Sequence, residues 1–191
     1  MIKFIESYSK NIINLINTIG ITDNHGTNLD ICKGVETICC LIKNNICRGS
    51  KVLFIGNGGS AAIASHMVID FWKNGKMPAM AFNDSSLLTC ISNDFGYQHV
   101  FEKPIEMFAG TGDVLFAISS SGKSENILRG VVAARTKGCK VVTLSGFKED
   151  NPQRGMGDLN LFVPSMEYGL VEVIHQYICH WILDTIMASK N

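Results

Sequence analysis

From Lys51 onward, five short apolar segments alternate with segments of helical periodicity. Continuous apolar strands separated by helices are typical of a parallel sheet with both faces covered. We therefore expect a doubly wound α/β fold, with a parallel sheet of about five strands sandwiched by helices. In such a fold, ligands bind at the carboxyl ends of the strands. The expected strands are residues 51–55, 79–82, 113–118, 140–144 and 160–163, the expected helices are 60–73, 85–92, 97–108, 124–136 and 168–188, and a loop is expected over 148–157.

Two further helical segments precede this alternating part. Apolar residues recur at helical spacing over residues 5–19 and again over 29–47, with a polar, glycine-containing linker at 21–28 between them. We expect all 191 residues to form a single domain, with an N-terminal helical arm over 1–48 and an α/β core over 49–191. The arm must bury its apolar face on the domain or on another subunit.

The composition argues against two classes of partner. Basic and acidic residues both number 17, so the formal net charge is zero and no basic surface indicates nucleic acid. No apolar stretch reaches the roughly 18 residues of a membrane helix, and the start of the chain lacks the pattern of a signal peptide. The seven cysteines form no CxxC pair and lie mostly in apolar runs, as the reduced thiols of a cytoplasmic protein do.

A glycine-rich turn directly follows the first expected strand of the core. Asn57, Gly58, Gly59 and Ser60 stand where a helix begins, and a helix N-terminus offers free backbone N–H groups to an anion. Glycine lets the backbone approach a ligand closely because it has no Cβ. The third glycine of the dinucleotide-binding fingerprint is missing, since Ala61 follows the serine.

A second turn, rich in hydroxyl groups, follows the expected strand at 113–118. Its Gly122-Lys123-Ser124 matches the end of a P-loop, but that motif needs a further glycine where the chain has Ala117. Hydroxyls and backbone amides at a helix N-terminus bind a phosphate monoester without a metal. The two turns together therefore predict a phosphorylated ligand. The hydroxyls are those of Ser119, Ser120, Ser121 and Ser124.

A third group consists of histidines and carboxylates on two expected helices. His66 and Asp70 are four residues apart, so their side chains share one face of a helix. Glu172, His175 and His180 follow on the last expected helix. Two histidines and two carboxylates form either a tetrahedral zinc site or an acid–base pair for proton transfer, provided that the fold brings the two helices together.

Four segments of the chain carry a resemblance to a known family. They are GNGGSAAIASHMVID, SNDFGY, ISSSGKSENI and the last expected helix. Together they resemble the phosphoheptose isomerases of the sugar isomerase (SIS) domain family, over nearly the whole chain. The resemblance implies a flavodoxin-like SIS fold and a homotetramer with sites at subunit junctions. It also implies conversion of sedoheptulose 7-phosphate to D-glycero-D-manno-heptose 7-phosphate through an enediol, for lipopolysaccharide or capsule.

The resemblance also implies roles for particular residues of this chain. The implied catalytic residues are Asp70, Glu172 and His180, and the implied zinc ligands are these three with His66. The implied substrate-binding residues are Asn57, Gly58, Gly59, Ser60, Asn93, Asp94, Ser119, Ser120, Ser121, Ser124 and Glu172.

Two of these positions depart from the family pattern. Asp70 stands where the family commonly has glutamate, and Glu172 stands where it commonly has glutamine. Two carboxylates hold a divalent cation more strongly than one, and either of them is a candidate for the base. The alternative function is a non-catalytic SIS protein that binds a sugar phosphate or a replication initiator. The presence of both Asp70 and His180 favours the enzyme.

Overall fold

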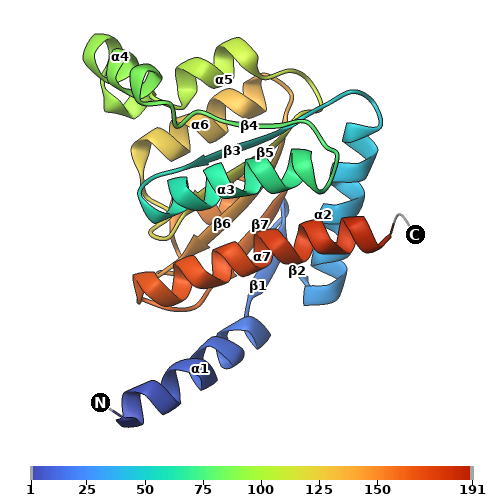
Figure 1. Ribbon diagram of the computed structural model, residues 1–191, viewed down its shortest axis with the longest axis vertical. Coiled ribbons are helices and arrows are strands. Elements are labelled where there is room, and N and C mark those ends of the chain that lie inside the picture. The colour runs from blue at the N-terminus through green and yellow to red at the C-terminus, as the bar shows by residue number, and fades with distance from the viewer. Residues whose placement is uncertain (1, 190–191) are drawn as a thin grey trace.

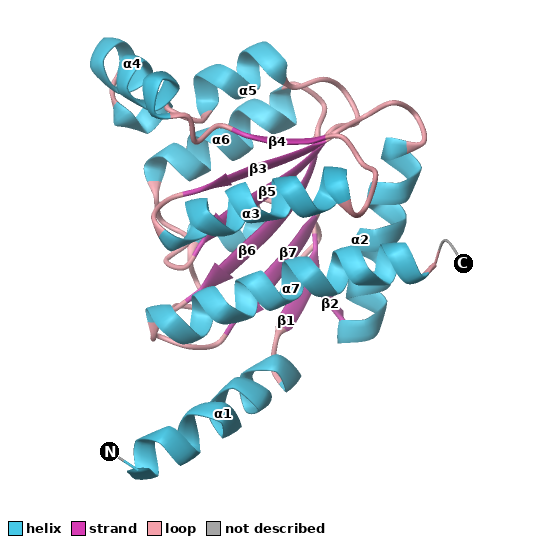
Figure 2. Cartoon of the chain, in the orientation of Figure 1, coloured by secondary structure: helices cyan, strands magenta, loops and turns pink. Residues whose placement is uncertain are grey.

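The computed structural model describes residues 2–189, so both ends of the expected domain, residues 1 and 190–191, lie outside the described part. One twisted sheet crosses the molecule between two layers of helices (Figures 1 and 2). Its seven strands have the order β2-β1-β7-β6-β5-β3-β4. The strands are β1 (Gly20–Asp23), β2 (Asn28–Leu29), β3 (Val52–Gly56), β4 (Ala79–Ala81), β5 (Val114–Ser119), β6 (Lys140–Gly146) and β7 (Leu159–Val163).

The five strands from β7 to β4 are parallel, as expected, but the sheet has seven strands rather than five. The expected linker at 21–28 forms most of the hairpin β1–β2, whose first strand pairs antiparallel with β7. Asp23 closes the hairpin by accepting hydrogen bonds from the N–H groups of His25 and Thr27. Ile21 is buried against Gly34, where a Cβ would lie 2.7 Å from its side chain. Pairing with β7 thus gives a mostly polar segment its strand conformation.

Within the described residues 2–189, seven α-helices and two 3₁₀ helices accompany the sheet. The expected helix at 97–108 is split between η1 and α5, because Pro104 has no N–H for the carbonyl of Val100 and its ring would clash there. No helix among the described residues has both the length and the apolarity to cross a membrane. The helices are α1 (Ile2–Asn17), α2 (Ile31–Ile46), α3 (Gly59–Lys73), α4 (Ser85–Phe95), η1 (Tyr97–His99), α5 (Glu102–Phe108), α6 (Glu125–Thr136), η2 (Pro152–Gly155) and α7 (Tyr168–Ala188).

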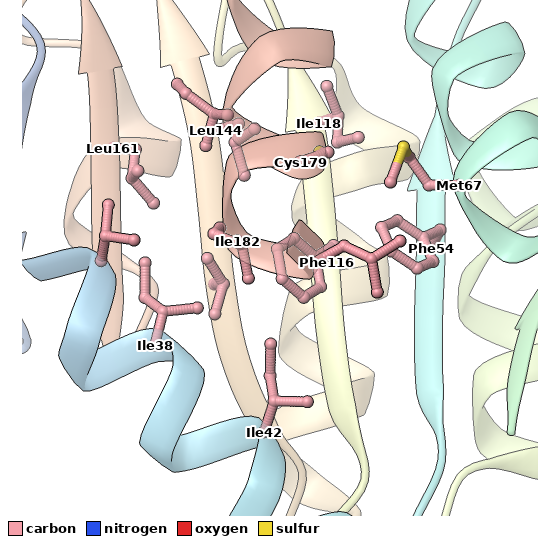
Figure 3. Packing of buried hydrophobic residues seen from close by; sticks show 14 of the residues in the cluster. Ile38, Ile42, Phe54, Met67, Phe116, Ile118, Leu144, Leu161, Cys179 and Ile182 are labelled. Atoms are coloured by element: carbon pink, nitrogen blue, oxygen red, sulfur yellow. The ribbon is translucent and has the colours of Figure 1, made fainter. Parts of the chain in front are cut away.

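The larger core lies between the sheet and the layer formed by α2, α3 and α7 (Figure 3). Phe54 on β3 stacks on Phe116 of β5 with ring centroids 4.9 Å apart, and Ile182 of α7 is buried in the same cluster. Ile38 and Ile42 of α2 are fully buried there as well. A second core under α5 and α6 fills the opposite face. The helix α2 is therefore an integral part of this layer.

The first helix lies apart from both layers and projects from the body (Figure 1). No residue of α1 is buried, although the helix is amphipathic and its last turns pack on α7. The large side chains of Phe4, Ile5 and Ile13 are exposed. An amphipathic helix with an uncovered apolar face needs a further surface to bury it.

Candidate functional site

A pocket of about 200 Å³ opens at the carboxyl edge of the sheet, between the turns that follow β3 and β5. The chain passes from β3 to β4 on one side and then returns to β5 on the other side of β3. The pocket therefore lies at the topological switch point of the sheet, where open α/β folds bind ligands. Its lining residues are Asn57, Gly58, Gly59, Ser60, Ile118, Ser119, Ser120, Ser121, Ser124, Tyr168 and Glu172.

The glycine turn forms one wall of this pocket. Strand β3 ends at Gly56, where a Cβ would lie 2.5 Å from the carbonyl oxygen of Ser60, so the turn closes this tightly only with glycine. Gly58 has a φ of +53°, a conformation that glycine adopts at little cost. Helix α3 begins at Gly59, and the N–H groups of Ser60 and Ala61 donate to the carbonyl of Asn57 over 2.9 and 3.3 Å. The N–H of Gly59 has no acceptor among the described residues and is available to an anion in the pocket.

The side chain of Asn57 is fixed by three hydrogen bonds. It exchanges two hydrogen bonds of 2.9 Å with the buried amide of Asn126, at the start of α6. The Tyr97 hydroxyl donates a third to the same Asn57 oxygen, over 3.0 Å. The glycine turn is thus tied to α6 and η1, and this arrangement presets its shape before any ligand binds.

The serine turn forms the opposite wall. Ser119 and Ser120 are buried, and Ser124 precedes the first residue of α6. The hydroxyl of Ser124 caps no backbone N–H and lies 3.5 Å from the Ser119 hydroxyl. It therefore remains available to a ligand, beside the positive end of the α6 dipole.

Two buried amide side chains support the serine turn from the expected loop at 148–157. Gln153 donates from its side chain to the carbonyl of Ala117 over 2.7 Å, and its backbone N–H donates to Gly122 over 3.2 Å. Asn151 packs so closely on Gly122 that a Cβ there would lie 1.9 Å from the Asn151 Oδ1. This support was not predicted from the sequence, because a polar segment that contains proline is typical of an exposed loop.

Helices α3 and α7 bring His66, Asp70 and His180 together, as the resemblance implies. The Asp70 Oδ2 lies 3.2 Å from His66 Nε2 and 3.7 Å from His180 Nδ1. The Asn74 amide donates to the other oxygen of Asp70 over 3.0 Å and orients the carboxylate. One ligand atom from each of the three residues lies within 4.8 Å of the others. Two imidazoles and a carboxylate form the donor set of open zinc sites, so these residues fit a zinc ion.

Glu172 and His175 lie elsewhere on α7. The Glu172 carboxylate lines the pocket directly above Gly59, where a Cβ would approach it to 2.5 Å. Eight residues of helix place it about 12 Å along the axis from His180. His175 is fully buried, and its Nε2 donates one hydrogen bond to the carbonyl of Ser145. Within one chain, Glu172 thus belongs to the pocket, and His175 belongs to the core.

Two expected substrate-binding residues, Asn93 and Asp94, lie outside the pocket of the described chain. Both are exposed on α4, where the Asn93 amide donates to Asp94 over 2.8 Å. Four site residues were missed, namely Tyr97, Ile118, Asn126 and Tyr168. Tyr97 belongs to the quoted SNDFGY segment, and Asn126 directly follows the serine turn, so their positions offered the only available signal.

A family model, related protein sequences and solved structures all give the same family. The model of the SIS domain family matches residues 30–146. The phosphoheptose isomerase of Haemophilus ducreyi is 38% identical over 155 residues, 78% of this chain and 79% of that protein. That of Vibrio cholerae is 37% identical over 158 residues, 80% of this chain and 82% of the relative. The structure of a phosphoheptose isomerase from Neisseria gonorrhoeae superposes with a TM-score of 0.83 at 26% identity, over 97% of this chain and 98% of that one.

Proposed function

Because this chain belongs to the SIS domain family, and within it to the phosphoheptose isomerases, we propose that it converts sedoheptulose 7-phosphate to D-glycero-D-manno-heptose 7-phosphate. The product would serve the synthesis of bacterial surface heptose, in lipopolysaccharide or capsule. The observation that carries the proposal is a pocket between the glycine turn and the serine turn, together with a group of two imidazoles and a carboxylate further along helices α3 and α7, which begin at this pocket.

The phosphate of the sugar would bind at the serine turn. The hydroxyls of Ser119, Ser120, Ser121 and Ser124, with the N–H groups that begin α6, offer a dense set of donors to its oxygens. Asn57, Gly58, Gly59 and Ser60 would bind the sugar hydroxyls on the opposite wall. Binding energy from the phosphate holds the reacting carbons in place, and this part of the ligand does not change during the reaction.

The chemical step would move one proton between two neighbouring carbons. We propose that His180 assists ring opening and that a carboxylate removes the proton from C1 and returns it to C2, through an enediol. Glu172 lies in the pocket and is one candidate for this base, and Asp70 beside the two histidines is the other. His66, Asp70 and His180 would hold a zinc ion. Glu172, the fourth ligand that the resemblance implies, lies outside this group within one chain and lines the pocket instead. Bound zinc supplies a Lewis acid that stabilises negative charge on the enediolate oxygen.

We further propose that the chain works as a homotetramer in the cytoplasm. Support for assembly comes from the exposed apolar side chains on α1 and on the outer faces of α3 and α7. A second copy on these faces would bury them and would bring further groups, Asn93 and Asp94 among them, to a shared site. Support for a reducing compartment comes from seven free thiols. The exposed side chains are Phe4, Ile5, Ile13, Ile69, Trp72, Val173 and Tyr177.

The test is turnover of sedoheptulose 7-phosphate by purified protein, together with its metal content. Asp70→Asn and Glu172→Gln each remove one candidate base. The variant that lacks the true base should have a kcat at least about a hundredfold lower than the wild type. Glu106→Gln is the matched control, because Glu106 is an exposed carboxylate of α5 that forms an ion pair with Lys103 and does not line the pocket. Sugar phosphate binding without turnover in the wild type would instead assign the non-catalytic function. Full activity in both site variants would reject the proposed bases.

A further inference from the structure

The residue that follows β6 has an unusual backbone conformation. Phe147 has a φ of +61°, in the left-handed region that bulky side chains rarely adopt. Its N–H donates to the carbonyl of Ser165 over 2.9 Å, and the preceding Gly146 donates to Ser120 in the serine turn over 3.0 Å. Strained residues of this kind persist where the surroundings fix them, and they gather at ligand sites.

The strained conformation places the Phe147 ring against Tyr168. The two ring centroids are 4.7 Å apart at 84°, the edge-to-face arrangement that aromatic pairs favour. Tyr168 opens α7 and lies one turn before Glu172, so both side chains share the helix face that lines the pocket. Phe147 is half-buried and also packs on the larger core, which fixes the pair in place.

Tyr168 differs in chemistry from the rest of the lining. It is the only aromatic residue among the eleven that line the pocket, where glycine, serine and asparagine predominate. Ligand pockets combine a few polar groups with an apolar or aromatic surface that covers the carbon part of the ligand. The serine and glycine turns supply the polar groups, whereas Tyr168 and Ile118 are the large apolar side chains of the lining.

We propose that Tyr168, held by Phe147, is the wall on which the carbon chain of the bound sugar phosphate packs. Tyr168 then determines affinity for the sugar part of the ligand, while the serine turn determines affinity for its phosphate. The inference rests on the proposed function, because it requires a phosphorylated sugar in this pocket. Phe147 is a positioning residue in this scheme, since it acts only through Tyr168.

The experiment compares two ligands by titration calorimetry. One is inorganic phosphate, and the other is sedoheptitol 7-phosphate, the reduced sugar phosphate that cannot isomerise. Tyr168→Ala should lower the affinity for sedoheptitol 7-phosphate about tenfold and leave the affinity for inorganic phosphate within twofold of the wild type. Tyr168→Phe should bind both ligands with the affinity of the wild type. Phe147→Ala should lose part of the affinity for the sugar phosphate that Tyr168→Ala loses. Phe147→Tyr keeps an aromatic ring and should bind the sugar phosphate as the wild type does. Met166→Ala is the matched control, because Met166 is as exposed as Tyr168 but does not line the pocket.

Three outcomes would overturn the inference. If Tyr168→Ala lowers the affinity for both ligands equally, Tyr168 acts on the phosphate. If Tyr168→Phe and Tyr168→Ala lose the same affinity for the sugar phosphate, the role belongs to the hydroxyl. If Tyr168→Ala binds the sugar phosphate as the wild type does, Tyr168 has no role in binding. Each of these can occur in a protein that still isomerises the substrate, so each rejects the inference alone. A wild-type protein that binds inorganic phosphate but no sugar phosphate would reject the proposed function and the inference with it.

Discussion

The buried histidine of α7 makes stability depend on pH in a defined window. His175 has no exposed surface, and its Nε2 lies 3.2 Å from the carbonyl of Ser145. Its Nδ1 has no hydrogen-bond partner among the described residues. Burial disfavours the charged imidazolium and lowers the pKa of His175 from 6.5 to about 4, while the bond to Ser145 opposes this only in part.

The size and sign of the effect follow from the two pKa values. An unfolded chain binds the proton near pH 6.5 and the folded chain only near pH 4, so the unfolded state holds more protons between these values. The free energy of unfolding therefore falls as the pH is lowered from 6.5 to 4, by up to about 1.4 kcal/mol per pH unit. Over the whole window, the loss from this one group amounts to about 3 kcal/mol.

Urea unfolding at one fixed protein concentration tests this, because assembly also contributes to stability. We expect the free energy of unfolding to decrease more steeply from pH 6.5 to pH 4.5 in the wild type than in His175→Gln, which has no titrating ring. His25→Gln is the control, since His25 is exposed in the β1–β2 turn. Equal pH slopes in the wild type and His175→Gln would refute the reasoning. Equal stability at pH 7 is not required, since only the slope reports the proton.

Three further predictions concern the site. Gly122→Ala should lower the free energy of unfolding in urea by about 1–3 kcal/mol, because its Cβ would meet Asn151 at a φ of +62°. The same variant should bind inorganic phosphate more weakly in calorimetry. Gly155→Ala, with no atom within 4 Å of its Cβ, should change neither quantity. Asn126→Ala frees the Asn57 amide and should lower kcat/KM about tenfold in steady-state assays, with the melting temperature reported alongside. Dialysis against a chelator should abolish turnover, and zinc should restore it, while calorimetric binding of inorganic phosphate stays unchanged.

The central strands were predicted from the sequence because burial on both faces leaves an uninterrupted apolar run. Strand β5, for example, was expected at residues 113–118 and spans Val114–Ser119, every residue of which is buried. The glycine and serine turns were predicted for a related reason. Each stands between a run of this kind and a helix, so their place at the carboxyl edge of the sheet followed from the strands alone.

The parts that were missed depend on contacts between distant residues. β1 becomes a strand because Ile21 and its neighbours pair with β7, some 140 positions later in the chain. The amide of Asn126 meets Asn57 across 69 positions, and the Tyr97 hydroxyl meets it across 40. Neither the periodicity of a segment nor the type of a residue predicts contacts between such distant positions. A polar residue that is buried by them looks like any exposed polar residue in the sequence.

The meeting of His66 and Asp70 with His180 lies between these two cases. The spacing of the first two residues predicted a shared helix face, but the third follows a strand that is three places away in the sheet. The helix between β5 and β6, α6, packs on the opposite face, and β6 is joined to β7 by η2 without an α-helix. Nothing therefore separates α3 from α7 on their own face, and the two helices pack together (Figure 1). The order of strands at the switch point thus produces both the pocket and the histidine group, which lies about two turns further along α3 and α7.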